Sequence, residues 1–147
     1  MNPKLEEQYA ANRVSVTRQL KYSDKNSNAL DLVLSINGIP LITAELKNPM
    51  TGQNVYHAIH QYKKDRDHRE RLFEFRKRSL VHFAVDTDLV FMTTRLAGSA
   101  TYFLPFNRGN DGGAGNPADP AGNNYRTAYL WKSVWKRDSF LDIAARF

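Results

Sequence analysis

The stretch ALDLVLSINGIPLITAELK, residues 29–47, decides how this chain folds. Apolar residues recur at every second position on both sides of Asn37-Gly38, and a period of two predicts β-strands over residues 29–36 and 40–47. Asn-Gly between two such strands is a strong β-hairpin signal. We expect the even-numbered apolar positions to share one buried face: Leu30, Leu32, Leu34, Ile36, Ile42, Ala44 and Leu46.

The odd-numbered positions share the other face, which gathers Asp31, Glu45 and Lys47. A plain two-residue loop would send Asp31 and Glu45 to opposite faces, so the hairpin needs an odd loop or a bulge. We expect a three-residue loop, residues 36–38, with a left-handed Gly38 as the bulge residue. That register places Asp31 opposite Thr43 and diagonal to Glu45, roughly 7–8 Å away at the backbone.

Two carboxylates and an ammonium on one sheet face suit phosphate chemistry with a metal ion. Mg²⁺ prefers oxygen ligands and takes one or two protein carboxylates together with water and substrate phosphate. Asp31 and Glu45 are the candidate ligands, with the backbone carbonyl of Leu46 beside them, and Lys47 is the candidate for orienting a nucleophile. The rival interpretation is a solvated strand face, on which Asp, Glu and Lys are common.

The rest of the chain alternates helix and strand signals. We expect a short helix at residues 1–11, strands at 13–20, 80–85, 89–94 and 101–106, an amphipathic helix from Val55, an exposed loop at 107–124 and helical spacing over 125–147.

Composition points to a polyanionic partner. The formal charge is +6 and the isoelectric point is near 9.7, and Lys and Arg that face phosphates gain affinity by releasing counterions. The segment 63–78 holds eight Lys or Arg against four Asp or Glu, so Lys63, Lys64 and Arg66 are candidate DNA contacts, with a solvated helix face as the alternative.

Composition also excludes some settings. The chain has no cysteine, which excludes disulfides and thiolate metal sites, and we see no secretory signal and no apolar run that could span a membrane. A cytoplasmic protein is the expectation.

Several segments resemble the N-terminal nuclease region of type I restriction enzyme R subunits. They are ANRVSVTRQLKYS (11–23), NALDLVLSINGIPLITAELKNPMTGQ (28–53), LVHFAVDTDLVFMTTRLAGSATYFLPFNRG (80–109) and the GAGNP loop (113–117). The resemblance implies a PD-(D/E)xK endonuclease fold of α/β class, with a central mixed sheet flanked by helices. It also implies that Asp31 and Glu45 bind the metal ion, that Lys47 is the catalytic lysine, and that Gln61 supports the site.

Further expectations come from that resemblance. The substrate would be double-stranded DNA, the cofactor Mg²⁺, and the partners the modification and specificity subunits of a type I complex. ATP would act only through a translocase that residues 1–147 do not contain, so we expect a single endonuclease domain, isolated from a longer subunit. The alternatives are a DNA-repair or junction-cleaving nuclease of the same core, and a nucleic-acid-binding remnant that no longer cuts.

Overall fold

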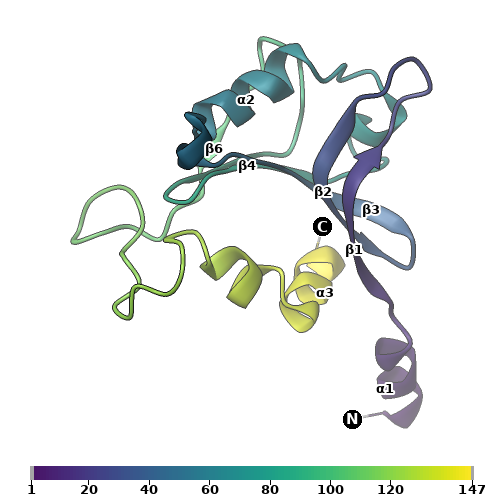
Figure 1. Ribbon diagram of the computed structural model, residues 1–147. Coiled ribbons are helices and arrows are strands. Elements are labelled where there is room, and N and C mark those ends of the chain that lie inside the picture. The colour runs from purple at the N-terminus through teal and green to yellow at the C-terminus, as the bar shows by residue number, and fades with distance from the viewer. Residues whose placement is uncertain (1, 147) are drawn as a thin grey trace.

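The chain folds into a six-stranded mixed sheet with helices on both faces (Figure 1). The structure is a computed structural model that describes residues 2–146; Met1 and Phe147, which we expected in terminal helical segments, lie outside that range. Strand order follows the sequence, with β3 and β4 parallel and the other neighbours antiparallel. The α/β class and the mixed sheet are therefore confirmed.

The elements follow one another in this order: α1 (Pro3–Ala10), β1 (Val14–Lys21), β2 (Ala29–Ile36), β3 (Ile39–Leu46), a 3₁₀ turn (Pro49–Thr51), α2 (Val55–Lys64), a 3₁₀ turn (Arg71–Phe73), β4 (Val81–Val85), β5 (Val90–Thr93), β6 (Leu104–Pro105), a π-helical turn (Leu130–Val134) and α3 (Arg137–Arg146). The strand expected over 101–106 is reduced to Leu104–Pro105. Proline has no N–H for the ladder, which limits pairing there. No helix within residues 2–146 has both the length and the apolar character needed to cross a membrane.

The hairpin turn differs from the expected three-residue loop. Asn37 and Gly38 form a two-residue turn with φ of 52° and 80°, and Ile36 pairs with Ile39. The register then shifts, because Ser35 pairs with Pro40 while Leu34 pairs with Ile42. The expected three-residue loop with Gly38 as bulge residue is wrong. A bulge is present, but it lies at Pro40 and Leu41, where proline interrupts the ladder.

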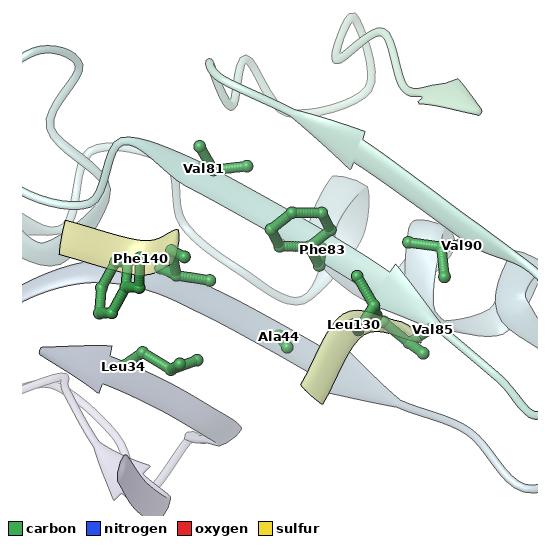
Figure 2. Packing of buried hydrophobic residues seen from close by; sticks show 9 residues of the cluster. Leu34, Ala44, Val81, Phe83, Val85, Val90, Leu130 and Phe140 are labelled. Carbon is green, nitrogen blue, oxygen red and sulfur yellow. The ribbon is translucent and has the colours of Figure 1, made fainter. Parts of the chain in front are cut away.

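One face of the sheet packs against the C-terminal helices. Ala44 of β3 lies between Leu34 of β2 and Phe83 of β4, and Leu130 and Phe140 of the C-terminal segment cover this face (Figure 2). Phe83 also meets the Trp135 ring edge-on at 5.6 Å between centroids. Leu32, Leu34, Ile36, Ile42 and Ala44 lie in or against this core, as the alternation predicts. The expectation for Leu30 is wrong, because it packs in the cluster of Val33 and Tyr62 instead.

The other face is also covered, which the hairpin pattern did not predict. Helix α2 lies over it (Figure 1), and Val55, Ala58 and Tyr62 of α2 are fully buried. Thr43 and Glu45 therefore have no exposed surface, so the odd-numbered face of the hairpin is a second interior layer.

Helix α2 is fixed at its N-terminus by the end of β4. Asn54 caps the helix, and the Val55 N–H donates to Asp86 Oδ2 at 2.8 Å. Asp86 Oδ1 also accepts the N–H groups of Asp88 and Leu89, each at 2.8 Å. One carboxylate thus joins the crossover helix to the β4–β5 turn and lies at the positive end of the helix dipole.

We expect the C-terminal segment to be part of the stable fold. Leu130→Ala should lower the free energy of unfolding by about 2–5 kcal/mol, because it empties a fully buried site against the sheet. The matched control Leu104→Ala, at a half-exposed position, should change it by about 0.5 kcal/mol or less. Urea unfolding of both variants measures the difference, and equal losses would mean that Leu130 does not pack on the sheet.

Candidate metal and phosphate site

Asp31 and Glu45 meet on adjacent strands beneath α2. Leu32 pairs with Ala44 and Val33 with Thr43, so the same register brings Asp31 opposite Glu45 on one face. The expected shared face is confirmed, while the diagonal arrangement is wrong because the bulge shifts the register. Asp31 Oδ2 accepts the Leu46 N–H at 2.8 Å, which holds its carboxylate beside the Glu45–Leu46 segment.

The second oxygen of Asp31 is held from β1. Gln19 Nε2 donates to Asp31 Oδ1 at 2.8 Å. Gln19 has a φ of 51°, a left-handed conformation that is uncommon for residues other than glycine and often marks a functional site. Sequence analysis missed Gln19, because nothing in the alternating pattern of β1 announces a left-handed residue.

Arg66 neutralises Glu45 inside the protein. The Arg66 Nε donates to Glu45 Oε1 at 2.6 Å, and a terminal nitrogen donates to the Ala29 carbonyl at 2.8 Å. Only 5% of the Arg66 side chain is exposed and none of Glu45. Arg66 is therefore buried and not on the surface, where we expected it to contact DNA. It pairs with the buried Glu45 carboxylate and holds that carboxylate in place.

The remaining oxygen of Glu45 has no protein partner. Glu45 Oε2 is buried without a hydrogen bond among the described residues. Burial raises the pKa of Glu45 to about 7, with the nearby charge of Asp31 adding to the effect and Arg66 opposing it. A buried, unpartnered carboxylate oxygen costs free energy, which a proton, a water molecule or a cation bound to it would reduce.

Lys47 follows Glu45 by two residues, just past the end of β3. Its N–H donates to the Val85 carbonyl at 2.8 Å, so extended pairing with β4 continues past the end of β3. Alternation predicts that its side chain lies on the face of Glu45. The side chain is half-buried, and no ion pair within residues 2–146 includes it.

Leu46, between Glu45 and Lys47, is not buried. It is 40% exposed and lines a cavity of about 250 Å³ together with Lys47, Tyr125 and Trp131. The expected burial of Leu46 is therefore wrong, because the C-terminal segment leaves this end of the sheet open. The contact of Leu46 with the carboxylates is through its backbone, whose N–H donates to Asp31 Oδ2.

The other candidates lie on α2. Gln61 is half-buried, and its Oε1 is a second buried oxygen without a partner. Lys63 and Lys64 occupy the last helical turn, where Lys64 is exposed and Lys63 half-buried. These two lysines remain the available cations of the expected set once Arg66 is paired.

A buried polar network lies behind the carboxylates. Thr43 Oγ1 lies 2.9 Å from the Tyr62 hydroxyl and 2.8 Å from His82 Nδ1. Burial lowers the pKa of His82 to about 3, so the ring is neutral at physiological pH. This network fixes the middle of α2 over β3. The alternating pattern of β3 alone does not predict it, because Tyr62 is supplied by α2.

The oxygen donors fit a hard divalent cation. Asp31 and Glu45 provide carboxylates, the Leu46 carbonyl lies between Glu45 and Lys47, and Mg²⁺ takes one or two carboxylates while keeping several waters. No cluster of three or more His, Cys, Asp or Glu able to hold a metal occurs within residues 2–146. The two carboxylates could therefore contribute to a sparsely ligated cation site, but by themselves they do not form a closed cage.

Glu45 gives the fold a pH dependence whose sign follows from its raised pKa. The ordinary pKa is 4.5 and the folded value about 7, so between them the folded state holds a proton that the unfolded state releases. The stability contributed by this group is complete below pH 4.5 and is lost as the pH rises through 7. His82 acts in the opposite sense, because its lowered pKa makes the unfolded state bind the extra proton below 6.5.

We expect Glu45→Gln to isolate this effect. Relative to wild type, the variant should gain free energy of unfolding as the pH is raised from about 4.5 to about 7.5, because Gln does not ionise while His82 is common to both proteins. Urea unfolding of both proteins at the two pH values measures the change. A difference that does not vary with pH would show that the pKa of Glu45 is not raised by folding.

Comparison with known proteins gives one match. Residues 6–101 match the family described as the type I restriction enzyme R protein N terminus, a range that contains Asp31, Glu45, Lys47 and Arg66. No curated protein and no solved structure matches the chain. Since the family match covers well over half of the 147 residues, the chain belongs to the family of type I restriction enzyme R protein N termini.

Proposed function

We propose that this chain is a Mg²⁺-dependent endonuclease region of a type I restriction system, with a PD-(D/E)xK core, that hydrolyses phosphodiester bonds of double-stranded DNA. The observation that carries the proposal is the buried, unpartnered Glu45 Oε2 opposite Asp31, with Lys47 two residues further along the chain. A surface strand would leave such a carboxylate in water. Here the fold buries it, pairs one oxygen with Arg66 and leaves the other open.

Asp31 and Glu45 would hold the ion through Asp31 Oδ2 or Oδ1 and Glu45 Oε2, with the Leu46 carbonyl. When bound, Mg²⁺ supplies positive charge that polarises a phosphate and makes a water molecule more acidic. Gln19 and the Leu46 N–H keep the Asp31 carboxylate in place through hydrogen bonds of 2.8 Å. A carboxylate fixed in this way does not have to reorganise when substrate binds.

Lys47 is assigned to the substrate rather than to the ion. Its ammonium cannot coordinate a cation, but it can orient the attacking water or stabilise negative charge that develops around phosphorus. No carboxylate within residues 2–146 pairs with it. Gln61, with its unpartnered oxygen, is a candidate to align water beside the same site.

The charge balance supports nucleic acid as the substrate. The protein carries a formal charge of +6, and Lys63 and Lys64 lie at the end of the helix that covers the site. In this proposal the chain works in the cytoplasm, with modification and specificity subunits choosing the DNA and a translocase elsewhere in the subunit using ATP.

Two substitutions separate the proposed roles. Lys47→Ala should keep Mg²⁺ binding and lower the nicking rate by about 10²–10³-fold, the usual effect of removing one transition-state donor. Asp31→Ala should lower both the Mg²⁺ affinity and the nicking rate, since it removes a proposed ligand of the ion. Calorimetric Mg²⁺ titration and nicking of supercoiled plasmid measure these, on this chain and in a complete R subunit with its partners. Lys25→Ala, at an exposed loop position, is the control and should nick normally.

Each other outcome has a definite meaning. Normal nicking by Lys47→Ala would mean that Lys47 is not catalytic and that residues 45–47 are only a charged strand end. Mg²⁺ and DNA binding by wild type without nicking, even in the complete assembly, would identify a non-cleaving binding module. Preferential cutting of branched over linear duplexes would favour the DNA-repair or junction-cleaving alternative.

A further inference from the structure

Phe75 holds two arginine side chains on its ring, away from the metal-site residues. The guanidinium carbon of Arg76 lies 5.2 Å from the ring centroid and that of Arg95 lies 5.3 Å from it. Phe75 itself is 41% exposed. Because a guanidinium is attracted to an aromatic face, the ring keeps both cations in one place at the surface.

Neither arginine is neutralised by a carboxylate within residues 2–146. Arg69 pairs with Asp67, and Lys77 pairs with Glu74, the acidic residue next to Phe75. Arg76 and Arg95 appear in none of the ion pairs of this part of the chain. Two positive charges are thus concentrated on an exposed ring with their hydrogen-bond donors available.

The backbone at Arg76 is held in an uncommon conformation. Its φ is 61°, in the left-handed region that residues with a Cβ rarely adopt. Such residues persist where their surroundings over-determine them, and they are concentrated at binding and active sites. Beside it lies a hollow of about 460 Å³ lined by Phe75, Arg76, Leu80 and Thr94.

A buried hydrophobic cluster connects this surface to α2, the helix over the proposed metal site. Leu72 and Phe73 precede Phe75, Leu96 follows Arg95, and all three pack with Tyr62 of α2 in one buried cluster. Tyr62 is followed by Lys63 and Lys64. The two arginines therefore stand on elements that pack against the α2 side of the sheet, the side that carries Asp31 and Glu45.

We propose that Phe75, Arg76 and Arg95 form a phosphate clamp for the backbone of duplex DNA, a second contact point separate from the metal site. Guanidinium groups bind phosphate through paired N–H donors, and a side chain already held in place loses less entropy on binding. The choice of DNA rests on the proposed function. The clamp itself needs neither Mg²⁺ nor cleavage, so binding can be measured with the metal chelated.

The test compares two double variants that remove equal charge. Arg76→Gln/Arg95→Gln should bind a 24-base-pair duplex several-fold more weakly than wild type, and the slope of log affinity against log salt should fall by about 1.8, or 0.9 for each lost contact. Arg69→Gln/Arg146→Gln removes two exposed arginines that are already paired with Asp67 and Asp142 and should bind nearly as wild type. Fluorescence anisotropy in EDTA over a potassium chloride series gives both quantities.

Phe75→Leu asks whether the ring organises the clamp. It keeps both charges, so binding should weaken while the salt slope stays near that of wild type. Circular dichroism and thermal unfolding of every variant serve as the control for an intact fold. Equal affinity and slope for the two double variants would overturn the clamp, as would a loss confined to duplex RNA of the same sequence. If the variants bind DNA as expected but the chain never nicks DNA, the clamp is supported and the proposed nuclease function is wrong.

Discussion

The buried ion pair between Arg66 and Glu45 is the interaction on which the site depends. Glu45 has no exposed surface, and a buried carboxylate without a partner would be strongly destabilising. Arg66 reaches it at 2.6 Å from the segment after α2 and also binds the Ala29 carbonyl. The pair therefore joins the end of β3, the start of β2 and the end of the crossover, so the position of one charged oxygen is linked to the packing of three elements.

Helix α2 is consequently fixed at both ends by charge and in the middle by a polar network. Asp86 receives the Val55 N–H at the N-terminus, and the pair with Arg66 closes the other end. Between them, the Tyr62 hydroxyl shares Thr43 with His82. Buried polar groups that are satisfied in this way specify one arrangement rather than many. A helix held like this gives the carboxylates beneath it a defined environment.

The parts of the fold that sequence could predict are those set by local pattern. Alternation gave residues 29–36 as a strand and put Asp31 and Glu45 on one face, because side chains in a strand repeat every second residue. The turn has two residues rather than the three that alternation predicts, because the irregularity lies at Pro40 and Leu41 rather than at Gly38. The contacts of Gln19 and Arg66 could not be predicted: one depends on a left-handed residue inside β1, the other on where the crossover ends.

The two cations near the carboxylates are not interchangeable, and their burial shows why. Arg66 is nearly inaccessible and uses its planar fork on Glu45 and a carbonyl at once, which the point charge of a lysine reproduces poorly. Lys47 is partly open to solvent and unpaired within residues 2–146, so its charge is still available to a ligand. Glu45 and Arg66 form a buried pair, whereas Lys47 forms no ion pair within residues 2–146. In the proposed nuclease, an arriving phosphate and cation would therefore draw on the lysine while the buried pair stays fixed.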